Sequence, residues 1–383
     1  MAEKMIKVAI LRKINNLEND DRIRKEVTSL KNIFPKVVFK CFVMLPENSE
    51  FEGVTSYGLP YKSIRLSSRD RFGSGKFLMA KMLDYYLSVR KELKKCDVVW
   101  CSGDAPTPIL FFIFRKPLVW DLRELPLFMM GSSFKDILLK YLFKKCTILL
   151  HANQYRIDYL SQKGLIKNTS NHFPIRNFPD FEEIDKEYDE RYNEVREWIG
   201  DRFCIYLQGL SDHSRASVET LTAVMDTPNV CAIVLGRYDE KCKKTVESVY
   251  GENELTSKIC FAGNFKVLKV PQYMQLCKIS LVFYKNVKPN NYYCEANRLY
   301  QAISMSLPVV VGNNPPMKSL VEKYKFGVSI DTDGRDIDLI KNGIKKVIEN
   351  YDEYYCNTKK YVDEIKWINQ EPLLEKIFCK LFK

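Results

Sequence analysis

Short apolar runs alternate with helical periodicity along most of the chain, and this alternation restricts the fold more than any other feature. In the first half, apolar runs predict strands at 6–11, 37–45, 97–101, 118–120 and 147–150, and the spacing of apolar residues predicts helices after Asp20 and at 76–95, 107–114 and 134–145. Strands that are apolar on both faces and separated by helices are typical of a parallel sheet covered on both sides. The first half is therefore predicted to be a doubly wound α/β domain.

The same alternation starts again after a stretch rich in proline and charge. Residues 173–192, FPIRNFPDFEEIDKEYDERY, favour a linker. Strands are then expected at 203–208, 232–235, near Ile259, at 279–283 and at 308–311, with helices at 214–225, 270–276 and 296–305. We therefore expect two Rossmann-like domains facing a cleft, 1–185 and 186–362, and a C-terminal helix within 363–383 that crosses back to the first domain. Ligands of such sheets bind beyond the carboxyl ends of the strands.

Composition narrows the class of protein. With 383 residues, of which 46% are hydrophobic, the chain has enough apolar material for the cores of about two domains. Its twelve cysteines form no C-x-x-C pair, which favours reduced thiols in a cytoplasmic protein. The opening residues do not resemble a signal peptide, and the apolar stretch 109–114 is far too short to span a bilayer.

A formal net charge of +12 favours an anionic partner. No C2H2 spacing, basic zipper or RNP signature is present, so we expect no nucleic acid. The helices at 76–95 and 134–145 combine apolar residues with lysines, which indicates either an anionic membrane surface or ordinary core-facing helices with solvated lysines. The chain lacks a P-loop, H-E-x-x-H, G-x-S-x-G and a complete dinucleotide fingerprint, and three histidines argue against a multi-histidine metal site.

Two segments of the second half have the features of a phosphate site. In EANRLYQ, a helix that begins near Asn297 presents unpaired backbone N–H groups, Arg298 adds a cation, and Gln301 lies one turn further on, within reach of a ribose hydroxyl. In YLQGLSDHSR, a strand ends at Gly209 and Arg215 opens the next helix. The alternatives are a core helix with a polar cap and a solvated surface arginine.

The order of several motifs resembles the retaining group 1 glycosyltransferases of the GT-B fold, of the bacterial surface-polysaccharide type. NDDRIRKEVTSL resembles their D-x-R-x-x-x-E helix, LVWDLRELP their D-x-H-E loop, and YLQGLSDHSR their Q-G-G-x-x-x-x-R phosphate loop. IVLGR and ICFAGNF resemble the strand ends beside the base, and EANRLYQAISMSLPVVVG the P-N-K-L-x-E-x-x-x-x-G-x-P-V segment. Three positions depart from the family pattern: Gln301 replaces the ribose-binding glutamate, Leu210 the first arginine of the phosphate loop, and Arg123 the histidine of D-x-H-E.

The resemblance implies transfer of a sugar from a nucleoside-diphosphate sugar, with UDP slightly favoured over GDP, to a glycan or lipid-linked acceptor, with retention and without a metal or other cofactor. It implies polysaccharide or glycoconjugate biosynthesis in the cytoplasm or at the inner face of the plasma membrane. A nucleotide-sugar epimerase and a non-catalytic glycan- or nucleotide-binding relative are the alternatives.

The resemblance also implies the site residues. The donor-binding residues are Gly209, Arg215, Gly236, Arg237, Asn264, Phe265, Tyr293, Asn297, Arg298, Leu299 and Gln301. The catalytic residues are Asp121, Arg123, Glu124 and Glu295, and the acceptor-binding residues are Asp21, Arg22 and Asp104. For the acidic residues and arginines of the first domain, the alternative is a salt-bridged loop.

Overall fold

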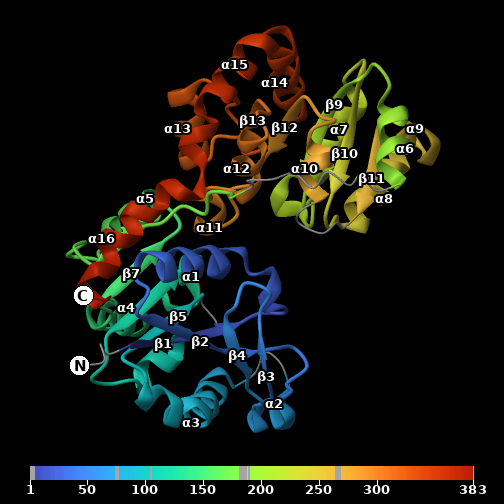
Figure 1. Cartoon of the computed structure of the whole chain (residues 1–383). Helices are drawn as coiled ribbons and strands as arrows, with labels where there is room; N and C mark the ends of the chain where they lie inside the picture. Colours follow the sequence, from blue (N-terminus) through green and yellow to red (C-terminus); the bar gives the residue numbers. More distant parts are fainter. Residues whose placement is uncertain are drawn as a thin grey trace. The chain divides into compact units, whose positions relative to one another are not determined.

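The computed structural model describes residues 5–73, 77–103, 106–180, 188, 190–263 and 269–382. The chain divides into two compact units (Figure 1): unit 1 comprises Met1–Asn177 and Ile368–Lys383, and unit 2 comprises Phe178–Trp367. Each unit contains one sheet with helices packed on it, as expected for two Rossmann-like domains. No helix in the described ranges is both long and apolar enough to cross a membrane.

Unit 1 is built on an eight-stranded sheet in the order β3-β4-β2-β1-β5-β6-β7-β8, in which only the β3–β4 pairing is antiparallel. The central strands β5 and β6 are buried on both faces, which explains why residues 98–101 and 118–120 are all apolar. The short hairpin of β3 and β4 was not predicted. The strands are β1 (Ile6–Lys13), β2 (Val37–Met44), β3 (Phe51–Val54), β4 (Pro60–Ser63), β5 (Val98–Ser102), β6 (Leu118–Leu122), β7 (Ile148–His151) and β8 (His172–Pro174).

The helices of unit 1 cover both faces of this sheet, with α1 and α3 on opposite sides (Figure 1). Segment 107–114, predicted as a helix, contains a 3-10 helix, η2 (Thr107–Phe112). The α-helices are α1 (Asp21–Ile33), α2 (Ser67–Phe72), α3 (Leu78–Lys95), α4 (Ser133–Lys145), α5 (Gln154–Gln162) and α16 (Glu371–Phe382), and the other 3-10 helices are η1 (Leu17–Asn19) and η3 (Leu127–Met129).

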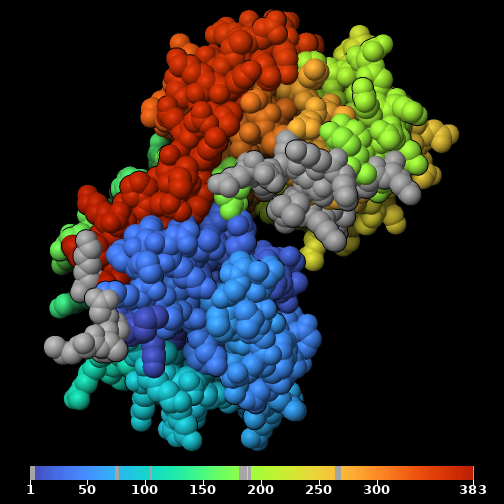
Figure 2. All heavy atoms as spheres, viewed as in Figure 1, coloured from blue at the N-terminus to red at the C-terminus, as the bar shows by residue number. Residues whose placement is uncertain are grey.

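The C-terminal helix α16 belongs to unit 1, as expected. Phe378 stacks on Trp100 of β5 with ring centroids 5.1 Å apart, and Phe382 meets Phe34, at the end of α1, at 5.3 Å. Figure 2 shows α16, in red, lying against the blue N-terminal part of the same unit. The last helix therefore completes the core of the first domain.

Unit 2 contains six parallel strands in the order β11-β10-β9-β12-β13-β14. They are β9 (Phe203–Gln208), β10 (Val230–Leu235), β11 (Ile259–Gly263), β12 (Ile279–Val282), β13 (Val309–Val311) and β14 (Gly327–Ser329). The helices are α6 (Glu190–Ile199), α7 (Ser217–Asp226), α8 (Glu240–Tyr250), α9 (Glu252–Lys258), α10 (Val270–Met274), α11 (Pro289–Tyr292), α12 (Asn297–Ser304), α13 (Pro315–Tyr324), α14 (Ile337–Glu349) and α15 (Tyr351–Tyr361), followed by η6 (Val362–Ile365). The 3-10 helix η7 (Trp367–Gln370) begins at the last residue of unit 2 and continues into unit 1. Because α6 starts at Glu190, the predicted linker 173–192 ends within a helix.

The predicted helix 214–225 is divided in two. Asp212 accepts a hydrogen bond from the backbone N–H of Ser214 at 2.8 Å and so caps a 3-10 turn, η4 (His213–Arg215). Ala216 then has a left-handed backbone, φ 53°, and α7 starts only at Ser217. Arg215 therefore lies in a tight turn before the helix and not at its first residue.

Candidate functional site

Three neighbouring strands of unit 2 end on glycines with a left-handed backbone. Gly209 follows β9 (φ 59°), Gly236 follows β10 (φ 79°) and Gly263 ends β11 (φ 79°). The chain is also hydrogen-bonded across these ends, because Gly236 N–H donates to the Gly263 carbonyl at 2.7 Å. Other residues are strained in this conformation, which explains why glycine stands at each of these three strand ends. Gly263 was not among the predicted residues, although a glycine after each strand is visible in the sequence.

Arg215 and Arg298 meet at the ring of Tyr284, just beyond β12. The guanidinium carbon of Arg298 lies 4.8 Å from the ring centroid and that of Arg215 lies 5.6 Å from it. Arg215 also donates to the Gly209 carbonyl at 2.7 Å, and Arg298 donates to the carbonyls of Gln208 at 2.8 Å and Phe283 at 2.6 Å. The two cations predicted from separate motifs are therefore held together at the carboxyl ends of β9 and β12.

Arg298 is a buried cation, 5% exposed. Burial lowers the pKa of its guanidinium, and repulsion from Arg215 acts in the same direction. Within the described ranges, neither arginine forms an ion pair with a carboxylate, and the buried Nε of Arg298 has no acceptor. A cation buried without a carboxylate partner is costly, so Arg298, beside the half-buried Arg215, favours an anionic ligand.

The other predicted donor residues surround this pair or lie elsewhere. Helix α12 begins at Asn297 without a side-chain cap, and although the Leu299 N–H donates to the Ala296 carbonyl at 2.9 Å, the N–H groups of Asn297 and Arg298 have no described acceptor and are available to an anion. The buried Oε1 of Gln301 accepts no hydrogen bond from any described residue. Glu295 is buried and Tyr293 half-buried. Arg237 is exposed, the Leu299 side chain is packed in the core, and Asn264 and Phe265 lie outside the described residues.

In unit 1, the predicted residues Asp121, Arg123 and Arg22 belong to one buried ion-pair network. Asp121 accepts from the Nε atoms of Arg22 and Arg123, each at 3.1 Å. Arg123 also pairs with Asp20 at 2.7 Å, and Arg22 pairs with Glu26 at 3.1 Å. This arrangement is the salt-bridged loop that was the alternative to a catalytic or acceptor-binding role, because the charged side chains pair with one another. A catalytic role for these residues stays a prediction.

Two pKa shifts describe this network. Burial raises the pKa of Glu26 to about 8 despite the neighbouring Arg22. Burial opposes ionisation of Asp20 as well, but Arg123 and Arg12 lower its pKa. The network therefore holds Asp20 ionised and favours a protonated Glu26.

Two further predicted residues of unit 1, Glu124 and Asp21, lie at or near the surface. Glu124 pairs with Arg156 at 3.0 Å, and Asp21 pairs with Lys25 at 2.6 Å. Asp104 lies outside the described residues.

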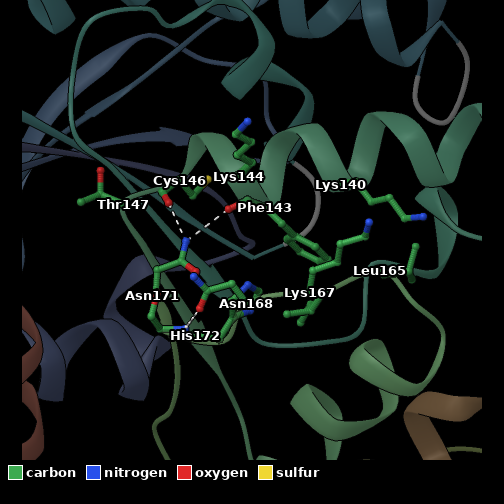
Figure 3. A pocket seen from close by; sticks show the side chains of 12 residues that line it. Lys140, Phe143, Lys144, Cys146, Thr147, Leu165, Lys167, Asn168, Asn171 and His172 are labelled. Atoms are coloured by element: carbon green, nitrogen blue, oxygen red, sulfur yellow. Dashed lines mark hydrogen bonds between the residues drawn. The ribbon is translucent and has the colours of Figure 1, made fainter.

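Unit 1 also has a cavity of about 620 Å³ that sequence reasoning missed. It lies between the end of α4 and segment 165–172, and Figure 3 shows the side chains of Lys140, Lys144 and Lys167 around it. Asn171 closes one side by donating to the carbonyls of Phe143 and Cys146. None of the predicted site residues lines this cavity.

Comparison with known proteins defines the fold class. No protein-family model and no curated protein sequence matches the chain. Among solved structures, sucrose-phosphate synthase from Thermosynechococcus elongatus has a TM-score of 0.75 at 12% identity, over 98% of this chain and 99% of that one. HepE from Anabaena in complex with UDP has a TM-score of 0.71 at 13% identity, over 98% and 100%. Trehalose-6-phosphate synthase from Burkholderia multivorans has a TM-score of 0.72 at 10% identity, over 99% of each chain.

These likenesses, together with the two parallel-sheet units, show that the protein has the GT-B fold. At such low identity the comparison defines the fold and not the reaction.

Proposed function

We propose that this protein is a glycosyltransferase that moves a sugar from a nucleoside-diphosphate sugar to an acceptor. The observation that carries the proposal is the pair of cations, Arg215 and Arg298, held without a described carboxylate partner at the strand ends of unit 2. A diphosphate is the natural counter-ion for such a pair. The likeness to HepE, whose structures contain UDP and UDP-glucose, supports a UDP-sugar as donor.

Each part of the donor has a proposed partner in unit 2. The diphosphate lies between Arg215, Arg298 and the first turn of α12, which stabilise the negative charge that develops on the leaving group. Because these groups supply positive charge, the proposed transfer needs no metal ion. Gln301 accepts a hydrogen bond from a ribose hydroxyl, and Glu295 holds the sugar.

We also propose retention of configuration at the transferred sugar and a glycan or lipid-linked acceptor, in polysaccharide or glycoconjugate synthesis. The support is the order of the motifs resembling retaining group 1 enzymes. We assign the acceptor to unit 1 on the same ground.

A membrane-carried acceptor is supported by an exposed apolar surface on unit 1. On α4, Phe134 is 70% exposed and Ile137 63%, and further exposed apolar side chains lie on and beside α3 and η2. Ring contacts join these elements: Tyr86 of α3 stacks on Phe112, and Phe111 stacks on Tyr141 of α4. Exposed apolar patches of this kind mark interaction surfaces. The apolar members are Phe77, Leu78, Met79, Leu83, Leu87, Phe114, Phe134, Ile137 and Tyr141, which we call the apolar face.

Lysines lie next to the apolar face. Lys145 lies 4.3 Å from the ring of Phe114, and Lys140 and Lys144 of α4 line the cavity in Figure 3. Apolar side chains beside lysines suit peripheral binding to an anionic leaflet, to which each nearby lysine contributes about 1 kcal/mol. We therefore propose a peripheral position on the cytoplasmic side of the plasma membrane.

A panel of UDP-, GDP- and TDP-sugars tests the reaction. Free nucleoside diphosphate that appears only in the presence of an acceptor supports transfer. An isomerised sugar would indicate the epimerase, and binding without turnover would indicate a non-catalytic relative.

Flotation with anionic and neutral liposomes tests the membrane proposal. We expect recovery on anionic vesicles that falls at high salt and falls further in a variant carrying Phe134→Ser and Ile137→Ser. The matched control is Val249→Ser in unit 2, where Val249 is 72% exposed. Equal recovery on both lipids, or none on either, contradicts charge-driven docking.

A further inference from the structure

Three side chains of different chemistry converge beside the Arg215 turn without a role in the proposed transfer. His213 begins η4, Asp239 precedes α8 and Cys242 lies in the first turn of α8. One ligand atom from each of the three lies within 4.8 Å of those of the other two. Histidine and cysteine come from segments 29 positions apart, so the chain fold and not local spacing brings them together.

The local structure of α8 fixes two of the three. Asp239 is the N-cap of the helix, and its Oδ1 accepts from the Lys241 N–H at 2.9 Å. This leaves Oδ2 turned toward Cys242, whose Sγ lies 3.5 Å away. The N-cap and the third helical residue are neighbours on the same side of a helix start. The carboxylate and the thiol are therefore a preformed pair.

The imidazole completes the set from the other side. The two ring nitrogens of His213 lie 3.8 and 3.9 Å from Cys242 Sγ. In a tetrahedral zinc site the ligand atoms lie about 2.0–2.3 Å from the ion, and therefore roughly 3.3–3.6 Å from one another. The separations from Cys242 Sγ to Asp239 Oδ2 and to the nearer His213 nitrogen are close to these values, and all three ligand atoms lie within 4.8 Å of one another. His213 is exposed, so a water molecule can supply a fourth ligand.

A catalytic triad is the obvious alternative for cysteine, histidine and aspartate, but the environment opposes it. Cys242 is 1% exposed, and burial followed by the charge of Asp239 raises the pKa of its thiol to about 11. Nucleophilic cysteines are accessible and have lowered pKa values. A bound divalent ion instead displaces the thiol proton and is favoured by the same carboxylate charge.

We propose that His213, Asp239 and Cys242 form a binding site for a zinc-class divalent ion. Thiolate and imidazole ligands select Zn²⁺ or Co²⁺ over Mg²⁺ and Ca²⁺. The ion is structural, because its ligands are not those that hold the donor in the proposed function. It joins α8 to the turn that carries Arg215, and reinforces the hydrogen bond from the Asp239 N–H to the Leu210 carbonyl at 2.8 Å.

The site has a consequence for the donor, which rests on the proposed function. Arg215 is two residues after His213 in the same 3-10 turn. An ion on His213 therefore fixes the turn from which Arg215 reaches the phosphates. Metal-loaded protein is expected to bind UDP more tightly than metal-free protein.

Metal binding is measured without nucleotide, so that its result does not depend on the transferase proposal. The full-length chain is stripped with a chelator, kept reduced and titrated with Co²⁺ alone while the thiolate-to-cobalt absorption is followed, and Zn²⁺ is then added in competition. We expect one equivalent of Co²⁺ with this absorption, displaced by Zn²⁺. His213→Ala should weaken binding by more than about tenfold, a loss seen even for residues that only support a ligand.

Two further variants make the result specific. Cys242→Ser should abolish the thiolate absorption, whereas Cys356→Ser, at the exposed cysteine of α15, should leave it unchanged. Cys242 is buried, so Cys242→Ser can fail to fold. The deciding comparison is therefore the Co²⁺ affinity of His213→Ala, a variant of an exposed residue, against that of the wild type. Absence of a one-equivalent transition, or equal affinity in wild type and His213→Ala, overturns the site. If metal binds as expected but UDP does not, the proposed function fails and the metal site stands.

Discussion

The guanidinium of Arg298 lies over the ring of Tyr284, 4.8 Å from its centroid, in a position where the arginine is 5% exposed. A cation over an aromatic face is partly stabilised by the ring, but a ring does not neutralise it. Arg215 approaches the same ring. The candidate donor site is thus a pair of like charges that an anion would stabilise, and several predictions of binding and stability depend on it.

Arg215→Ala is expected to weaken UDP binding while leaving the fold intact. Arg215 is half-buried and donates to one carbonyl, that of Gly209. Loss of a charge-assisted contact to phosphate corresponds to about 1.5–3 kcal/mol, roughly 10- to 150-fold in affinity. Calorimetric titration of the wild type and the variant with UDP measures this difference in affinity.

Arg298→Ala is the comparison for Arg215→Ala and should have two effects. It weakens UDP binding to a similar extent, and it also leaves the buried carbonyl of Phe283 without its donor, at about 1–3 kcal/mol of folding stability. Its melting temperature should therefore fall, whereas that of Arg215→Ala should not. Unchanged UDP affinity in both variants would remove the proposed phosphate site.

Gly209→Ala is expected to act through Arg215. A Cβ at Gly209 would lie 2.7 Å from Arg215 Nη1, in a backbone conformation with φ 59°. Gly200→Ala, at the end of α6, is the matched control, because its φ is 56° but its Cβ would meet nothing closer than 3.9 Å. Both variants should lose about 1–2 kcal/mol of stability to backbone strain. Gly209→Ala alone should also weaken UDP binding.

A double variant tests that explanation. If Gly209→Ala displaces Arg215, adding Arg215→Ala should change the UDP affinity little further, because both changes remove the same contact. Additive losses in the double variant would show that Gly209 acts on the ligand directly.

The sequence predicted the strands best where burial is complete. Most residues of β5 and β6 are apolar because both faces of these strands are covered, so composition alone reveals them; the exceptions are the buried Ser102 and Asp121 near their carboxyl ends. The hairpin β3–β4 was missed because Phe51 and Val54 are exposed and leave no apolar alternation. The left-handed Ala216, which divides the predicted helix and sets the position of Arg215, has no signature in the residue type.

The candidate site was predictable residue by residue but not as an arrangement. Arg215 and Arg298 were found from their motifs, whereas Tyr284, which lies against both, carries no motif of its own. Likewise, Arg22 and Asp121 are 99 positions apart, and only the fold shows that they form a buried ion pair. Long-range pairing of this kind leaves no local pattern.

Phe378→Ala is expected to destabilise the protein strongly. Phe378 is fully buried in unit 1 and stacks on Trp100, so truncation to alanine creates a cavity and should lower the free energy of unfolding by about 3–5 kcal/mol. The control Ile368→Ala, at a side chain 56% exposed, should have little effect. Denaturant titration distinguishes them, and equal stability of the two variants would show that α16 is a dispensable tail.

In the wild-type protein, Glu26 is expected to make the free energy of unfolding decline as the pH rises. Glu26→Gln should remove this decline. Burial raises the pKa of Glu26 to about 8 in the folded protein, above its unfolded value of about 4.5. Between these values the folded state binds the proton more tightly, so stability is highest below pH 4.5 and declines as the pH rises toward 8. Denaturation of wild type and variant at pH 5.5 and 8 measures the difference; a decline of equal size in Glu26→Gln would assign it to other groups.

The buried histidine pair of unit 1 should act in the opposite direction. His151 Nε2 lies 2.9 Å from His172 Nδ1, so one ring donates and the other accepts, which requires that the accepting nitrogen carries no proton. Burial lowers the pKa of His172 to about 4, and burial together with His172 lowers the pKa of His151 well below its usual value.

In the unfolded chain both histidines are protonated near pH 6.5, whereas in the folded protein they are protonated only at much lower pH. The stability that the pair provides is therefore present above pH 6.5 and is lost as the pH falls toward 4. From pH 6.5 to 5 two such groups remove at most about 4 kcal/mol. Two proteins should be compared by denaturation, the Glu26→Gln variant and the Glu26→Gln, His172→Gln double variant. In both of them the titration of Glu26, which acts in the opposite direction, is absent. The added change should reduce the acid sensitivity, since one titrating ring and its partner's repulsion are gone. An identical loss between pH 6.5 and 5 in both proteins would place the acid-sensitive groups elsewhere.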